Sequence, residues 1–291
     1  RDSGKGITVK RIGISADSSC DLSAEIAEQY GITVIPQAII MEGRTYRDGI
    51  ELKPADIFRH VSAGGEICST TAINTAEYCG AFTELRKECG ALIHFTIGSA
   101  LSSCYQNAVL AAEEVPGVTV VDSMNLTTGI GYLAVAAAKM AEAGMEPEAI
   151  ATKLENLKTC MDVSFVIDKL DYLRKGGRCS AVTAFGANLL NIRPSISVRD
   201  GELAVDRKYR GSFRQCVRKY IGERLDAVQG RCVPDVIFLT HAACPEAVVV
   251  EARELIRNRG IFSEILVTEA GCTVSSHCGP NTLGIIFAVK S

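Results

Sequence analysis

The amino-acid sequence predicts an α/β protein with two domains: an N-terminal Rossmann-like parallel sheet with helices on both faces, and a C-terminal α+β domain. Three observations predict this fold class. The chain has 291 residues, 47% of them hydrophobic, which is enough for two ordinary domains with ample cores. Strand-like and helix-like segments alternate in the first half, as they do in βαβ units. Hairpin patterns are mixed with helices in the second half.

The first domain is expected to span residues 9–160. Two segments, 91–97 and 117–123, are continuously apolar, which is typical of strands buried on both faces of a parallel sheet. Gly31 closes the first helix, because glycine readily takes the left-handed conformation there. We expect strands at 10–17, 32–41, 91–97 and 117–123, and helices at 22–31, 75–90, 103–115 and 127–144.

The second domain is expected to span residues 161–291, after a helix at 147–160. Residues 193–211 read as a hairpin, because Asp200-Gly201 favours a tight turn between two strands. We expect further strands at 163–167, 235–241, 264–270 and 283–289, and helices at 212–228 and 245–260.

The composition excludes several classes of protein. A net charge of −3 gives no overall bias toward nucleic acid or an anionic membrane, although local basic patches leave transient membrane contact open. No apolar run reaches the roughly 18 residues that a membrane helix needs. The first residues contain no apolar signal-peptide core, so we expect a cytoplasmic protein without a nucleic-acid partner.

The twelve cysteines do not follow a metal-binding or redox template, since none forms a C-x-x-C pair. Most lie in apolar runs, where cysteine behaves as a small buried hydrophobe. We expect buried free thiols in a reducing compartment, and neither a cofactor nor a metal. Cys272, His277 and Cys278 form a weak metal candidate.

Hydroxyl side chains concentrate where three predicted strands lead into helices. Open α/β sheets bind ligands at this edge, and helix N-termini favour anions. One such junction alone would indicate ordinary helix capping. Three together indicate a binding site for an anionic group. The hydroxyl residues are Ser69, Thr70, Thr71 and Thr75; Ser99, Ser102 and Ser103; and Ser123, Thr127 and Thr128.

The bound group is expected to be a single carboxylate or a neutral carboxylic acid. No Walker lysine is present, and the Gly-Ile-Gly at 129–131 is too short for a dinucleotide fingerprint. Asp17 and Asp122 would repel a phosphate unless a metal intervened. A buried methylene contributes roughly 0.8 kcal/mol against about 1 kcal/mol for a hydroxyl hydrogen bond, so an acyl tail would dominate binding. The apolar segment 181–192 is a candidate wall for such a tail.

Four motifs occur in an order that is similar to one protein family. They are ADSSCDL at 16–22, VVDSMNLTTGIG at 120–131, YLRKGGRCS at 172–180 and SSHCGPNTLGIIF at 275–287. On these motifs the chain resembles the DegV family of bacterial fatty-acid-binding proteins, from Arg11 to Val289.

The resemblance implies a fatty acid buried between the two domains. Thr70 and Ser102 would hold the carboxyl group, with His277 beside it. The sequence departs from the family pattern at residues 70–74 and at 103–104, which leaves the loop shape and the chain preference open. The remaining candidate ligand-binding residues are Thr71, Asn74, Ser99, Ser103 and Arg178; of these, Ser99 and Ser103 also suit helix capping.

The resemblance also implies a partner, the catalytic subunit of a fatty-acid kinase. That kinase would phosphorylate the bound carboxyl group, while this protein, a monomer, presents it without catalysis; Arg178 would help to dock the kinase.

His277 lies next to Gly279-Pro280, so a turn is expected to expose it. Chain length, unsaturation and any redox role of Cys104 or Cys278 stay open.

Two enzyme classes are the alternatives. A serine hydrolase would use Ser102, His277 and Asp122, although no serine lies in a G-x-S-x-G motif. A metal-dependent phosphatase would use Asp17 and Asp122.

Overall fold

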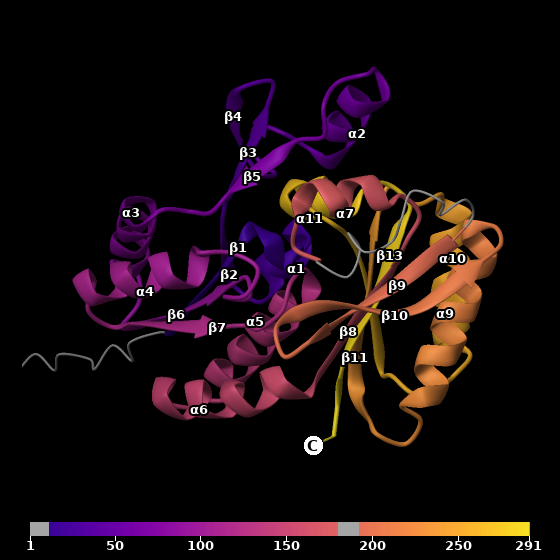
Figure 1. Cartoon of the computed structure of the whole chain (residues 1–291). Coiled ribbons are helices and arrows are strands. Elements are labelled where there is room, and N and C mark those ends of the chain that lie inside the picture. Colours follow the sequence, from indigo (N-terminus) through magenta and orange to yellow (C-terminus); the bar gives the residue numbers. More distant parts are fainter. Residues whose placement is uncertain (1–11, 180–191, 291) are drawn as a thin grey trace, which may run out of the picture.

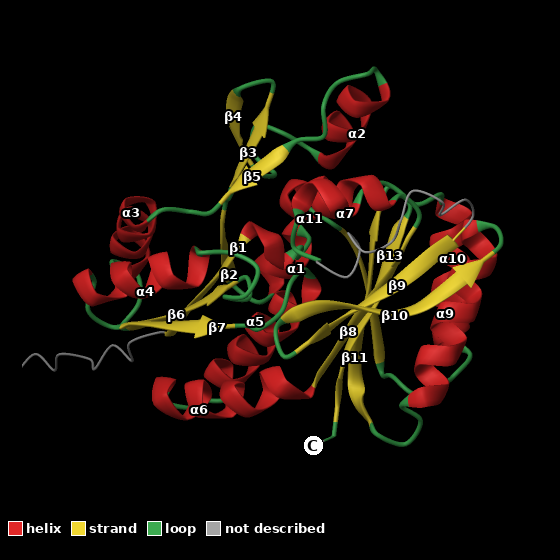
Figure 2. Ribbon diagram, viewed as in Figure 1, coloured by secondary structure: helices red, strands yellow, loops and turns green. Residues whose placement is uncertain are grey.

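The structure, a computed structural model, describes residues 12–179 and 192–290. These residues form three β-sheets with helices packed on them (Figures 1 and 2). The fold is a two-domain α/β architecture, as the sequence predicted.

The N-terminal domain contains a parallel sheet in the order β2–β1–β6–β7. Its strands are β1 (Ile12–Asp17), β2 (Ile32–Ile35), β6 (Ala91–Thr96) and β7 (Val118–Asp122). One apolar cluster joins a face of this sheet to α3 (Thr75–Arg86) and α4 (Cys104–Glu114). A second cluster joins the other face to α1 (Ala24–Gln29), α5 (Thr128–Glu142) and α6 (Pro147–Leu157). The predicted Rossmann-like sheet is therefore confirmed.

Helix α5 lies between the two domains and is buried along most of its length. Ile130 and Leu133 share one core with Phe238 and Ile286 of the second domain. At Gly131, a Cβ atom would lie 2.7 Å from Leu22 Cδ2 and 2.9 Å from the carbonyl oxygen of Cys20. The glycine-rich start of α5 therefore serves close packing of the helix.

The C-terminal domain contains a mixed six-stranded sheet in the order β10–β9–β8–β13–β11–β12. Helices α9 (Phe213–Ala227) and α10 (Glu246–Arg257) pack on one face, while α7 (Leu170–Gly176) and α11 (Cys272–Cys278) lie at one end (Figure 1). The strands are β8 (Met161–Ile167), β9 (Ile192–Arg199), β10 (Glu202–Arg210), β11 (Cys232–Ala242), β12 (Glu264–Glu269) and β13 (Thr282–Val289).

The predicted hairpin is confirmed as β9–β10. Asp200 and Gly201 form its turn with φ angles of 50° and 82°, the pair of positive values that a tight primed turn requires. The first strand of the second sheet, β8, begins at Met161, directly after the domain boundary that we propose.

A small antiparallel sheet, β4–β3–β5, was not predicted. It consists of β3 (Ala38–Met41), β4 (Arg44–Arg47) and β5 (Ser69–Thr71), and α2 (Pro54–Ser62) packs beside it. Two short 3₁₀ helices, η1 (Ser18–Cys20) and η2 (Lys158–Cys160), complete the described elements.

Two expectations about this region were wrong. The strand region expected at 32–41 is not one strand of the parallel sheet: it is divided after Ile35, because Pro36 cannot donate a ladder hydrogen bond, and its halves join different sheets. Residues Ser69–Thr71 do not end a strand of the parallel sheet; they form β5, which pairs with β3. The apolar wall expected at 181–192 lies outside the described residues except for Ile192.

Candidate functional site

A cavity of about 160 Å³ opens between the small sheet and the two domains. One part of its wall is polar and the other is apolar, so it suits an amphipathic molecule. The polar residues are Gln37, Thr70, Thr71, Ser102, Ser103, Arg178, Thr273 and His277. The apolar residues are Ala72, Ile97, Leu101, Leu126, Phe165, Leu173, Leu203 and Val274.

Thr70 and His277 meet across the cavity wall although 207 positions separate them. Thr70 Oγ1 lies 2.8 Å from His277 Nε2. His277 is on helix α11 and partly buried, so the expectation that a turn exposes it was wrong. Burial, with the charge of Arg178 as a second cause, lowers the pKa of His277 to about 4, and the imidazole is therefore neutral at pH 7. Its buried Nδ1 has no hydrogen-bond partner among the described residues.

Ser102 is the serine that bonds the backbone where α4 begins. Its Oγ accepts a hydrogen bond from Cys104 N and donates one to Cys104 Sγ, both at 3.3 Å. Ser103 occupies the N-cap position, but its side chain makes no capping bond. Ser99 donates its hydroxyl to Asp122 Oδ2. The expectation that Ser99 and Ser103 cap the helix was therefore wrong.

Asn74 and Ser99 lie away from the cavity wall, unlike the other candidate residues. Asn74 forms a capping box with Glu77 at the start of α3, where each side chain accepts the other residue's N–H. Because Asn74 and Ser99 are engaged in these local bonds, we do not propose them as ligand contacts. The candidates that line the cavity are Thr70, Thr71, Ser102, Ser103, Arg178 and His277.

Arg178 brings a positive charge to the cavity wall. Its Nε donates to the carbonyl of Leu101 at 3.3 Å and its Nη1 to the carbonyl of Gly176 at 2.6 Å. Between residues 12–179 and 192–290, no carboxylate forms an ion pair with it. A carboxylate ligand would balance this charge.

Sequence reasoning did not identify Gln37 and Thr273 as cavity residues. Gln37 follows Pro36, the break between β2 and β3, and its Nε2 lies 3.7 Å from Cys104 Sγ. The break at Pro36 was the available signal, since a proline inside a predicted strand marks an irregular position. Thr273 had no comparable signal.

The geometry does not assemble either alternative active site. His277 Nε2 bonds Thr70 and Asp122 bonds Ser99, so Ser102, His277 and Asp122 form no hydrogen-bonded triad in the described structure. Asp17 is fully buried and accepts bonds from Tyr78 and from the backbone of Ile97.

The cysteines show neither metal-binding nor redox geometry in the described chain. No group of three or more His, Cys, Asp or Glu side chains there is arranged to hold a metal. Cys272 Sγ donates to the carbonyl of Leu52, so the weak candidate with His277 and Cys278 is not supported. All twelve cysteines lie in the described residues as thiols, and eight of them are buried. Burial raises the pKa of Cys104 to about 11 and that of Cys278 to about 12, so both thiols are protonated at neutral pH.

The fold and cavity define a two-domain α/β protein with an amphipathic cavity between its sheets. Known proteins share this architecture over nearly the whole chain. The family model of DegV, described as an uncharacterised protein family, matches residues 11–290. A DegV domain-containing protein of Caldanaerobacter subterraneus is 30% identical over 288 residues, covering 97% of this chain and 100% of that protein. This chain therefore belongs to the DegV family.

Two solved structures extend the comparison. A DegV family protein from Thermus thermophilus, described by its fatty-acid binding, has 30% identity and a TM-score of 0.88, with 96% of this chain and 99% of that chain covered. DegV from Bacillus subtilis, described as a fatty-acid-binding protein, has 27% identity and a TM-score of 0.83, with 97% and 100% covered. In the described residues, no helix is long and apolar enough to span a bilayer.

Proposed function

We propose that this protein binds one long-chain fatty acid in the cavity between its domains. The carboxyl group would lie against Thr70, Ser102 and His277, and the acyl chain along the apolar part of the wall. One observation carries the proposal: hydroxyls, a neutral imidazole and a guanidinium that pairs with no carboxylate of the described residues share a cavity with apolar side chains.

The polar part of the cavity suits a carboxylate. Hydroxyls and a neutral imidazole donate hydrogen bonds, and Arg178 contributes the opposite charge. Each hydroxyl bond contributes about 1 kcal/mol net. Each buried methylene contributes roughly 0.8 kcal/mol, so the acyl chain would supply most of the affinity and the polar residues would set its orientation.

The relatives support this proposal. The Thermus thermophilus and Bacillus subtilis proteins are both described as binding fatty acids and superimpose over nearly the whole chain. Their similarity makes a fatty acid the first ligand class to test.

Purification without added lipid, followed by denaturation and mass spectrometry, tests the proposal. We expect near-stoichiometric fatty acid in the wild-type protein and a marked loss in Thr70→Ala and Ser102→Ala. Ser99→Ala is the matched control, because that hydroxyl lies in the same loop but bonds Asp122. A wild-type protein that is empty and takes up no added fatty acid would contradict the proposal.

The bound acid would be the substrate of a separate cytoplasmic kinase, with this protein acting as a monomeric, non-catalytic carrier. In that reaction a carboxylate oxygen attacks the γ-phosphorus of ATP, ADP leaves, and an acyl-phosphate forms. Hydroxylamine converts an acyl-phosphate to a hydroxamate, which mass spectrometry detects. We expect no hydroxamate from the loaded protein with Mg²⁺ and ATP alone, and hydroxamate once the kinase is added. Hydroxamate without the kinase would make this protein an enzyme.

A further inference from the structure

Helix α11 places Thr273, Val274 and His277 in the cavity wall, but its own residues do not stabilise its N-terminal turn. The helix has seven residues, and isolated helices of this length are unstable in water. Its N-cap residue is Gly271, which has no side chain to accept the unpaired N–H groups of the first turn. The acceptors must come from elsewhere in the fold.

Asp48, more than 220 positions earlier in the chain, supplies most of them. Its Oδ1 accepts from Cys272 N at 2.8 Å, and its Oδ2 accepts from Thr273 N at 3.0 Å and Thr273 Oγ1 at 2.7 Å. Ser18 Oγ also donates to Asp48 Oδ2 at 2.9 Å and accepts from the N–H of Gln37, a cavity residue. The side chain is buried, so water does not replace these bonds.

Asp21 supplies a further acceptor and reaches a second part of the cavity wall. Its Oδ1 lies 2.8 Å from Gly271 N, and its Oδ2 lies 2.5 Å from Thr127 Oγ1. Thr127 has a φ of 49°, an unfavourable conformation for a β-branched residue, and it directly follows Leu126 in the cavity wall. Asp21 therefore joins the start of α11 to the β7–α5 loop.

The side chains of Asp21 and Asp48 approach the same glycine at the start of α11. A Cβ atom at Gly271 would lie 3.1 Å from Asp21 Oδ1 and 3.5 Å from both Asp48 carboxylate oxygens. The absence of a Cβ atom at Gly271 thus leaves room for the Asp21 side chain beside that of Asp48.

We propose that Asp21 and Asp48 are positioning residues for the ligand: together they fix α11 and the β7–α5 loop so that His277, Val274 and Leu126 face the cavity. The inference rests on the proposed function for its readout, but the geometry on which it is based involves no ligand. Neither Asp21 nor Asp48 lines the cavity, so each acts through other residues.

The first test replaces Asp48 by an isosteric amide. Asp48→Asn exchanges one acceptor oxygen for an NH₂ group, so either Cys272 N or the Thr273 donors lose their partner. We expect the delipidated variant to bind a fluorescent fatty acid about tenfold more weakly or worse, the effect of losing one bond to a charged group. Asp162→Asn is the matched control, because Asp162 is a buried carboxylate that bonds Arg224 and is remote from α11.

A second readout separates positioning from general destabilisation. The imidazole NMR signals of His277, assigned by comparison with His277→Gln, should shift in ligand-free Asp48→Asn and stay in place in Asp162→Asn. Thermal melting of both variants shows how much stability each has lost. Equal fatty-acid affinity and unshifted His277 signals in Asp48→Asn would overturn the proposal.

Asp21 provides a test if Asp48→Asn does not fold. Asp21→Ala removes both bonds and should weaken fatty-acid binding, whereas Asp21→Asn should restore it. An amide oxygen can accept from Gly271 N and an amide NH₂ can donate to Thr127 Oγ1. Equal binding by the alanine and asparagine variants would contradict the role of Asp21. If the wild-type protein binds no fatty acid, the proposed function fails, and the His277 signals alone decide whether Asp48 positions that ring.

Discussion

Asp21 is the residue whose protonation the fold changes most clearly. Complete burial, with the nearby Asp48 as a lesser cause, raises the pKa of Asp21 from 3.8 to about 8, although bonds from Thr127 and Gly271 oppose the shift. The folded protein therefore keeps this carboxyl protonated at neutral pH, while the unfolded chain loses the proton near pH 4.

This difference predicts how stability depends on pH. A group whose folded pKa is raised stabilises the fold fully below its unfolded pKa, and this contribution is lost as the pH rises through the folded pKa. We therefore expect the free energy of unfolding to fall between pH 4 and pH 8. Asp21→Asn stays neutral at every pH, so its decline should be shallower. Urea unfolding at several pH values measures both slopes, and parallel curves would contradict the prediction.

At the residue scale, the sequence motifs and the helix-capping rules predicted only some of the side-chain contacts. They singled out Thr70, Ser102 and His277, and the structure brings all three to the cavity wall. They failed for Ser99, because its partner Asp122 ends a neighbouring strand 23 positions away. Hydrogen bonds between residues far apart in the sequence decide which of several adjacent hydroxyls faces a cavity. Such bonds cannot be recognised in the local sequence.

At the element scale, the pattern of hydrophobic residues in the sequence was sufficient to predict the long strands and helices. It was insufficient to predict the short strands. The buried strands of the parallel sheet and the hairpin turn at Asp200-Gly201 have strong local patterns, and both were predicted correctly. The small sheet has strands of three or four residues, too short for alternation to be recognised. Thr70 lies in this sheet, so its position next to His277 had no periodic signal.

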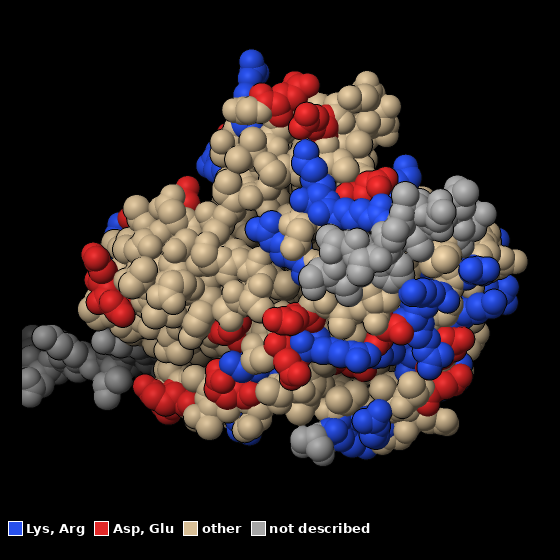
Figure 3. Space-filling view, viewed as in Figure 1, with Lys and Arg blue, Asp and Glu red and all other residues tan. Residues whose placement is uncertain are grey.

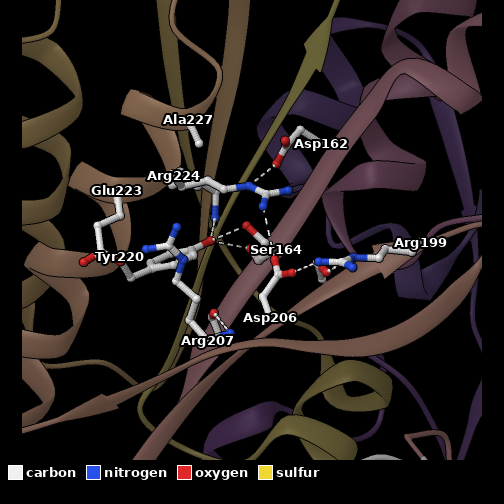
Figure 4. A network of polar contacts seen from close by, with 12 residues as sticks. Asp162, Ser164, Arg199, Asp206, Arg207, Tyr220, Glu223, Arg224 and Ala227 are labelled. Carbon is white, nitrogen blue, oxygen red and sulfur yellow. Dashed lines mark hydrogen bonds and ion pairs between the residues drawn. The ribbon is translucent and has the colours of Figure 1, made fainter.

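The β9–β10 hairpin is joined to α9 by a polar network. Arg224 on α9 donates to Asp162 on β8 at 2.8 Å and to Asp206 on β10 at 3.1 Å, and Arg199 also bonds Asp206 (Figure 4). A β-bulge between Val205 and Arg207 accompanies this arrangement. Basic side chains gather over the hairpin and α9 on the face shown in Figure 3, and the network neutralises part of that charge.

The network predicts unequal effects for two arginines of the same helix. Arg224→Ala leaves Asp162 and Asp206, with exposed fractions of only 9% and 11%, without this partner, and should cost about 3 kcal/mol of unfolding free energy. Arg214→Ala is the control, because Arg214 is 60% exposed and pairs with Glu251, a bond expected to contribute below about 1 kcal/mol. Urea unfolding at neutral pH measures the free energy of unfolding of both variants. Equal losses of unfolding free energy would contradict the larger contribution that we assign to Arg224.

At the scale of the whole molecule, the cavity wall combines segments from both domains and from the small sheet. Ser102 and Thr70 come from the first half of the chain, whereas Phe165, Leu203 and His277 come from the second. The class of fold follows from local alternation of strands and helices. The cavity depends on how the sheets pack against one another, which is why the shape of its wall could not be derived from the sequence.

A ligand that contacts all these segments should stabilise the molecule as one unit. Binding only to the folded state adds about 2.7 kcal/mol of stability at a free ligand concentration 100 times the Kd. For a chain of this size we expect myristic acid to raise the Tm of delipidated protein by roughly 5 °C. The two domains should unfold in a single transition when monitored by far-UV circular dichroism and by tyrosine fluorescence.

The matched alcohol separates the contribution of the carboxyl group from that of the acyl chain. 1-Tetradecanol has the same length but no charge to pair with Arg178, so at equal concentration it should raise the Tm less than myristic acid does. Ser102→Ala should bring the two shifts closer together, because it removes a contact that we assign to the carboxyl group. Equal shifts in the wild-type protein would mean that the apolar wall alone recognises the ligand, and would contradict the role assigned to the hydroxyls.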